Sequence, residues 1–283
     1  GYLIDQTGSD SLANADKDGE KAVDFRNLHK ISSVGAGQVL ATIMPPKRGI
    51  PGKSIYGAAI AAKNGKPCKL KAGKNVLFHA GQLIASADGQ VSFTPASVNV
   101  YPVFEVNGDL DLKTGNIDFI GNVVIRGNVP SGYKLKAGGD IYIDGLVENA
   151  VLASGGSIVI GGGVTGMRHG VLEAGADVQA AYLNQASVKA GADVLVSSSI
   201  LHSQILSGGR VVCKKGHIIG GKVEAHKGVE TNDIGNLHYT RTLICIGDFQ
   251  RAADREAEIH REMDILGNSL SKLKVVCHKL NMK

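Results

Sequence analysis

Histidine side chains recur inside a repetitive stretch of the sequence, where stacking could bring them together as metal ligands. Four of the nine histidines fall in this stretch: His169, His202, His217 and His226. Stacked repeats align only those residues that share an offset within the repeat. Their offsets from the repeat starts are 17, 14, 12 and 3 residues, so the histidines do not align. The spacing favours separate surface or turn histidines over a metal cluster.

Three aspartates do share one offset in the repeat: Asp140, Asp177 and Asp193. Like charges stacked on adjacent strands repel each other unless a cation or hydrogen bonds compensate. The calcium-binding solenoid nonapeptide, with its Gly-Gly-x-Gly-x-Asp run, is absent from the sequence. We therefore expect Asx-type turn bonding by these carboxylates and no calcium.

Other chemical motifs are missing. The sequence contains no Gly-x-Ser-x-Gly elbow, P-loop or His-Glu-x-x-His motif. The four cysteines (Cys68, Cys213, Cys245 and Cys277) are far apart and form no CxxC pair, which is typical of reduced cytosolic thiols. The sequence predicts no catalytic residues, no cofactor and no metal site.

The stretch that carries these residues repeats a short phrase. The phrase is an aliphatic residue, two small or polar residues, glycine, two further residues and a second aliphatic. Copies start at Leu135, Leu152, Leu172, Val188 and Ile205, with a decayed copy at Val223. The starts are 17, 20, 16, 17 and 18 residues apart, and a nearly fixed period indicates stacked structural repeats.

Each repeat is too short for two helices, and its Val, Ile and Gly content favours strands and tight turns. Aliphatic residues recur six apart, as in Leu135, Ile141 and Val147, which predicts three short faces in each coil of a β-solenoid. One stacked internal row is predicted to contain Ile141, Ile158, Val178, Val194 and Val211. The glycines are predicted to form corners with positive φ: Gly138, Gly155, Gly175, Gly191 and Gly208.

The solenoid is predicted to begin near Val103 and to contain seven or eight coils. The 20-residue spacing after Leu152 requires extra residues, and Thr165–Gly170 is the predicted bulge. Insertions in repeats map to one face and often bind partners. Met167, Arg168 and His169 are therefore candidate interaction residues.

Three regions are predicted: a β-rich domain over residues 1–100, a parallel β-helix over 101–247 and a coiled-coil helix over 248–283. In the first region, Gly37–Met44 alternates like a strand, and Pro45–Gly52 reads as an extended turn. The lysines between Lys63 and Lys74 have no aromatic residue among them. They are predicted to form a solvated face and to bind no nucleic acid, because bases lack a stacking platform.

Apolar residues after Asp248 fall at alternating spacings of four and three, which is the seam of a coiled coil. The seam contains Ile259, Met263, Leu266, Leu270 and Leu273. A lone helix cannot bury this seam. A homotypic coiled coil, a returning second helix and docking on the β-helix all remain open.

No apolar run approaches 18 residues, and no secretory signal begins at Gly1. We therefore expect a cytoplasmic chain with no membrane insertion. The abrupt start and end of the sequence indicate a fragment of a longer protein.

Several stretches of the sequence resemble the bacterial flagellar assembly protein A family. The resemblance rests on Pro46–Gly57, Lys71–Val76, Thr114–Gly127, Ile234–Asn236 and Thr242–Gly247. It implies a β domain, a right-handed parallel β-helix and a coiled-coil tail, in a cytoplasmic protein placed at the cell pole. Its implied partners are the glucose-specific IIA component of the phosphotransferase system and the polar flagellar-placement machinery. The family carries no agreed catalytic residues.

Two function classes remain open. The first is a non-enzymatic scaffold of flagellar assembly that binds proteins through its β-helix and helical tail. The second is a left-handed hexapeptide-type acyltransferase with His202 or His169 as its base. Coils of 16 to 20 residues, with glycine three places after the aliphatic residue, favour the scaffold.

Overall fold

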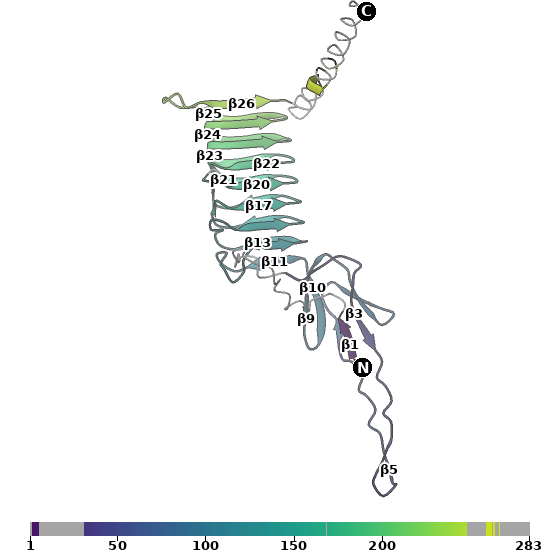
Figure 1. The fold of residues 1–283 in the computed structure, drawn as a ribbon. Coiled ribbons are helices and arrows are strands. Elements are labelled where there is room, and N and C mark those ends of the chain that lie inside the picture. Colours follow the sequence, from purple (N-terminus) through teal and green to yellow (C-terminus); the bar gives the residue numbers. More distant parts are fainter. Residues whose placement is uncertain are drawn as a thin grey trace, which may run out of the picture.

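The computed structural model describes residues 2–5, 31–167, 169–247, 259–261, 263 and 266. The chain is mainly β, and its largest part is a parallel β-solenoid of about eight coils. The coils stack in a straight column, and a group of short antiparallel strands adjoins the first coil (Figure 1). The solenoid and its three-faced coil were predicted correctly from the spacing of the aliphatic residues.

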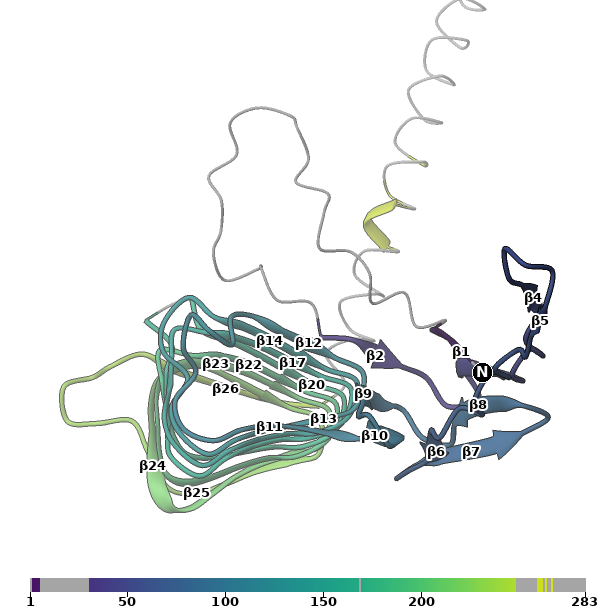
Figure 2. The same cartoon turned by 90° about the horizontal axis from the view of Figure 1, so that it is seen from below.

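Each coil is triangular in cross-section (Figure 2). Face A consists of β12 (Ile117–Phe119), β14 (Lys134–Ala137), β17 (Val151–Ser154), β20 (Val171–Ala174), β22 (Ser187–Ala190), β26 (Thr242–Ile246) and the last parts of β23 (Val194–Ser207) and β24 (Arg210–Ala225). Face B consists of β11 (Val103–Val106), β13 (Asn122–Ile125), β15 (Ile141–Ile143), β18 (Ile158–Ile160), β25 (Gly228–Ile234) and the first parts of β21 (Val178–Asn184), β23 and β24. Face C consists of β16 (Val147–Glu148), β19 (Val164–Thr165) and the later segments of β21, β23 and β24.

Stacked aliphatic rows fill the interior of the column. On face B, Ile141 pairs with Ile158, and the register continues through Val178 and Val194 to Val211, all fully buried. On face C, Val147 and Val164 lie in one such row. The predicted internal row is therefore confirmed. Burying each such side chain stabilises the fold by roughly 1.5 to 3 kcal/mol.

The glycines at the corner between faces A and B do not have positive φ, so that prediction was wrong. A Cβ atom on Gly191 would lie 2.1 Å from the carbonyl oxygen of Gly175, and one on Gly175 would lie 2.2 Å from that of Gly155. These positions require glycine because adjacent coils approach each other closely there.

Left-handed backbone occurs instead at the corner between faces C and A. The residues with positive φ there include Gly132, Asn149, Met167, Gln185, His202 and Gly220, and four of these six carry side chains. Backbone bonds between coils hold this corner, because Asn149 N donates to Thr165 O and Gln185 N donates to Leu201 O. The coil geometry sets the conformation at this corner, and the residue type does not.

The N-terminal strands form two four-stranded sheets. The first has the order β1 (Tyr2–Asp5), β3 (Val39–Met44), β8 (Gln82–Ala85) and β7 (Val76–His79). The second has the order β2 (Ser33–Val34), β9 (Gly89–Phe93), β10 (Ser97–Tyr101) and β6 (Lys71–Ala72). Leu40, Leu83, Val98 and Val100 are central to their own small core.

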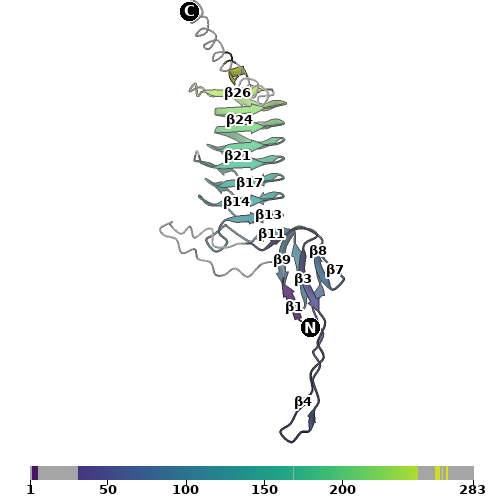
Figure 3. The ribbon, with the colours of Figure 1, turned by 45° about the vertical axis from the view of Figure 1, so that its right-hand side comes forward.

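Residues 45–68 leave the N-terminal sheets as a projecting ribbon, which we call the hairpin arm (Figure 3). Its tip is a two-stranded sheet of β4 (Gly52–Lys53) and β5 (Ala59–Ile60). The sequence predicted an extended turn here. The structure adds that this turn belongs to an arm with most of its residues exposed.

The predicted coiled coil lies mostly outside the described residues. Ile259, His260, Arg261, Met263 and Leu266 are helical, and Ile259, Met263 and Leu266 are exposed. The described residues contain no helix of seven residues or more, so they do not support the coiled coil. Among them, no helix is long and apolar enough to cross a membrane.

Candidate docking groove

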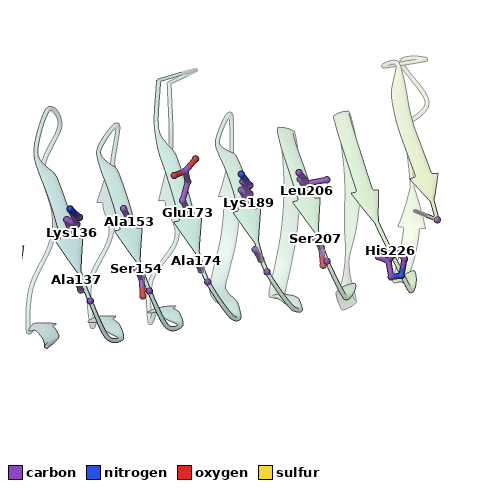
Figure 4. A pocket seen from close by; sticks show the side chains of 17 residues that line it. Lys136, Ala137, Ala153, Ser154, Glu173, Ala174, Lys189, Leu206, Ser207 and His226 are labelled. Atoms are coloured by element: carbon purple, nitrogen blue, oxygen red, sulfur yellow. The ribbon is translucent and has the colours of Figure 1, made fainter. Parts of the chain in front are cut away.

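A groove of about 700 Å³ runs along the solenoid where face A turns toward face B (Figure 4). Seven coil levels contribute to it, from Lys136 at one end to Gly247 at the other. Six steps of about 4.8 Å between stacked strands give a length of about 29 Å. A helix of about 19 residues has the same length, at 1.5 Å per residue. We call this feature the flank groove.

The floor of the groove consists of small residues. Five strand segments of face A end in a small, inward residue that glycine follows: Ala137, Ser154, Ala174, Ala190 and Ser207 precede Gly138, Gly155, Gly175, Gly191 and Gly208. The glycines that let coils approach also leave no side chains over this corner. The same local sequence therefore produces both the close stacking and the groove.

One wall of the groove consists of the outward side chains of face A. Lys136, Glu173 and Lys189 stand along this wall, followed by Leu206 (Figure 4). Glu173 pairs with Lys189 in the strand register, so opposite charges are neighbours. A smaller hollow of about 260 Å³ continues across the wall toward Lys222 and Glu224. A long, shallow trough with mixed charges at its wall suits a peptide or helix better than a small molecule.

The two serines in the floor are already engaged in hydrogen bonds. Ser154 Oγ donates to Gly139 O at 2.7 Å and accepts from Gly156 N at 3.1 Å. Ser207 Oγ likewise donates to Ala192 O at 2.7 Å and accepts from Gly209 N at 3.1 Å. These hydroxyls close the corner, and this bonding gives no sign of an activated nucleophile.

The aligned aspartates also stabilise the stacking. Asp140 Oδ1 accepts from Ser157 N, and Asp177 Oδ1 accepts from Asp193 N, both at 2.8 Å. Asn122 does the same for Asp140 N at 2.9 Å. The prediction that these carboxylates accept hydrogen bonds is confirmed, but the predicted Asx-type turn was wrong, because the acceptors bond to the next coil and not within their own turn.

Among the residues that the structure describes, no group of three or more His, Cys, Asp or Glu side chains is placed to hold a metal ion. His226 lines the flank groove, whereas His169 lies in the bulge and His202 at the corner between faces C and A. His169 and His202 belong to different coils. The three described cysteines, Cys68, Cys213 and Cys245, are free.

The bulge predicted at Thr165–Gly170 is present as extra residues after β19. Met167 has positive φ and a 55% exposed side chain, and His169 is also exposed. Arg168 lies outside the described residues. The bulge does not line the flank groove, so Met167 and His169 stay separate interaction candidates that nothing here tests.

The seam residues of the tail stay untested too. Ile259, Met263 and Leu266 are described and exposed, while Leu270 and Leu273 lie outside the described residues. Gly247, the last residue of the solenoid region described, itself lines the groove. The last described residue before the tail therefore lies at one end of the flank groove.

Sequence reasoning did not predict the flank groove. The available signal was the small residue before each glycine, at a fixed offset in every repeat. Small residues at the end of a strand are ordinary when taken singly. Only their stacking in register makes a continuous trough.

These features define a class: a parallel β-solenoid protein with an extended groove and no assembled catalytic constellation among its described residues. A family model of the Flagellar Assembly Protein A beta solenoid domain matches residues 102–283. A second, for the N-terminal region of the same protein, matches residues 2–96. The chain belongs to the flagellar assembly protein A family, as its sequence motifs predicted. No curated protein and no solved structure matches it.

Proposed function

We propose that the chain is a non-enzymatic scaffold of flagellar assembly whose flank groove binds an amphipathic helix. The observation that carries the proposal is the groove itself. It extends over seven coil levels on a floor of small residues, and charged side chains stand at its wall. Family membership supports the setting in flagellar assembly.

The sequence pattern predicts a suitable helix in the tail of this protein. Its seam from Ile259 to Leu273 covers 14 residue steps, or about 21 Å of helix, which fits within the length of about 29 Å estimated from the strand spacing. The first half of the tail is rich in acidic residues, and these suit Lys136 and Lys189 at the groove wall. The described seam residues Ile259, Met263 and Leu266 are exposed in the single chain, so we propose that the seam of a second copy occupies the groove in the free protein.

A partner helix would then compete with the tail for the groove. The resemblance noted above supplies candidates: the glucose-specific IIA component of the phosphotransferase system and the polar flagellar-placement machinery. On this proposal the cell pole is the site of action, and the scaffold switches between a tail-bound and a partner-bound state.

The test uses a labelled peptide of residues 256–276 and a chain that ends at Gly247. We expect the peptide to bind this chain in a fluorescence anisotropy titration. An Ala153→Arg substitution places a long side chain at the groove and should weaken binding at least tenfold. Gln179→Arg, on the outward side of face B, is the matched control. Absence of binding, or equal loss with the control, would contradict the proposal.

A further inference from the structure

The hairpin arm exposes large apolar side chains far from the groove. Ile50, Ile55 and Tyr56 are 91%, 92% and 90% exposed, and Ile60 is also exposed. The arm extends well beyond the N-terminal sheets, so no other described element covers its tip (Figures 1 and 3). Contiguous exposed apolar groups of this kind mark an interaction site.

The tip of the arm is held by its own hydrogen bonds. Gly57 N donates to Ser54 O at 2.9 Å, and Ser54 N donates to Ala58 O at 2.8 Å. Ser54 Oγ also accepts from Ala58 N at 3.1 Å. Gly57 takes the positive φ that closes this turn. Ile55 and Tyr56 occupy the two central positions of the turn and are therefore presented outward in a fixed geometry.

Side chains alternate between the two faces of the ribbon. Gly52 pairs with Ile60 and Lys53 pairs with Ala59, and Gly65 N donates to Lys47 O in the same register nearer the base. Because successive residues point to opposite faces, one face carries Ile50, Ala58, Ile60 and Ala62 near the tip, with Arg48 closer to the base. The other face carries Lys47, Lys53 and Lys63. The half of the arm nearer the tip is therefore amphipathic.

The charge of the arm has one sign. Residues 45–68 contain five Lys or Arg residues and no Asp or Glu, and the next acidic residue in the sequence is Asp88. The lysines at positions 47, 53, 63, 66 and 69 and Arg48 are all exposed. A complementary partner must therefore be anionic and must also accept apolar side chains.

We propose that the hairpin arm docks on an anionic lipid surface, with Ile55, Tyr56 and the apolar face entering the interface and the lysines contacting headgroups. Isoleucine and tyrosine together suit the boundary between acyl chains and headgroups. The ribbon is one strand layer thick, so lysines on its second face lie within about a Debye length, ~8 Å, of that surface. Lysine stems can bend toward the headgroups.

Two other occupants fit less well. A second copy of the arm would bring like charges together, which opposes association. An acidic protein would need a pocket shaped to the projecting tip, whereas a fluid lipid surface conforms to it. This proposal is independent of the flank groove, which lies on the solenoid.

The experiment measures the partition coefficient of the full chain on vesicles of phosphatidylcholine that contain about 30 mol% of the anionic lipid phosphatidylglycerol. We expect binding that falls as salt rises and that is absent on pure phosphatidylcholine. Ile55→Ser with Tyr56→Ser should lower the partition coefficient at least tenfold. Lys47→Gln, Lys53→Gln and Lys63→Gln together should lower it about 100-fold, since each surface lysine contributes close to a factor of five.

Matched controls exist elsewhere in the chain. Leu237 and Tyr239 are 94% and 96% exposed in the last coil, so Leu237→Ser with Tyr239→Ser removes an equal apolar pair. Lys134, Lys215 and Lys227 are exposed lysines of the solenoid and provide the charge control. Failure of the full chain to bind, equal binding to neutral vesicles, or equal losses in the controls would overturn the proposal. Binding to poly-L-glutamate that depends on the tip, without vesicle binding, would assign the arm to an acidic protein and also overturn it.

Discussion

Two corners of the same coil form their sharp turns in different ways. At the corner between faces A and B, glycine recurs in stacked coils because the adjacent coil leaves no room for a Cβ atom. The φ angles of these glycines are not positive. At the corner between faces C and A, φ is positive, yet Asn149, Gln185 and His202 stand there. Recurrent glycine in a solenoid therefore marks close approach between coils, and left-handed backbone can occur without it.

The largest effect should follow from a side chain at the crowded corner. Gly175→Ala places a Cβ atom against the carbonyl of Gly155, and overpacking of this kind costs about 1 to 3 kcal/mol or more. Gly35→Ala is the control, because its nearest neighbour would lie 3.6 Å away. Urea unfolding compares the two variants. Equal stability would contradict the role assigned to the glycines.

A smaller loss should follow from removing an acceptor at the same corner. Asp177→Ala leaves Asp193 N without the bond that Asp177 Oδ1 now accepts at 2.8 Å. A fully buried unsatisfied donor costs about 1 to 3 kcal/mol, and this half-buried donor should cost about 1 kcal/mol. Asp177→Asn keeps the acceptor, as Asn122 does in an earlier coil. The denaturant midpoints of the parent and of Asp177→Asn should therefore be similar, and both should be higher than the midpoint of Asp177→Ala. A loss with Asn equal to that with Ala would show that the charge matters and not the bond.

The left-handed corner should give a change of opposite sign. Gln185 has φ of 51°, and such backbone costs a residue with a side chain roughly 1 to 2 kcal/mol. Gln185→Gly should therefore raise the unfolding free energy by up to about 1 kcal/mol, after the entropic cost of glycine. Asn184→Gly, one residue earlier in β21, should lower it. Thermal unfolding of both variants decides whether the conformation is strained.

The smallest effect concerns the third corner, where Cys213 is fully buried near Gly216. Burial raises the pKa of the Cys213 thiol, although a bond from Gly216 N lowers it in part. In the unfolded chain a thiol ionises near pH 8.5, so the unfolded state loses its proton first and stability falls as pH rises above that value. Cys213→Ala should flatten the alkaline decline of the melting temperature between about pH 8 and 10. A decline as steep as that of the parent would contradict this cause.

The register of the solenoid could be predicted because buried aliphatic residues must recur wherever the coil points inward. Leu135, Ile141 and Val147 carry that signal in one repeat. The role of Gly175 could not be predicted, since the sequence contains no distance between coils. The flank groove was missed for the same reason. It forms because small residues and glycines stack in register over several coils, and the sequence does not show this stacking. The exposure of Ile55 and Tyr56 also depends on where the arm stands in space.

The uniform stacking of the coils has a further consequence, which concerns length. Each coil contacts mainly the coils above and below it, so stability grows by nearly equal increments as coils are added. Inserting or deleting one whole coil would lengthen or shorten the solenoid by about 4.8 Å and would leave its cross-section unchanged. If the flank groove binds a helix as proposed, the number of coils would set how many helical turns fit along it.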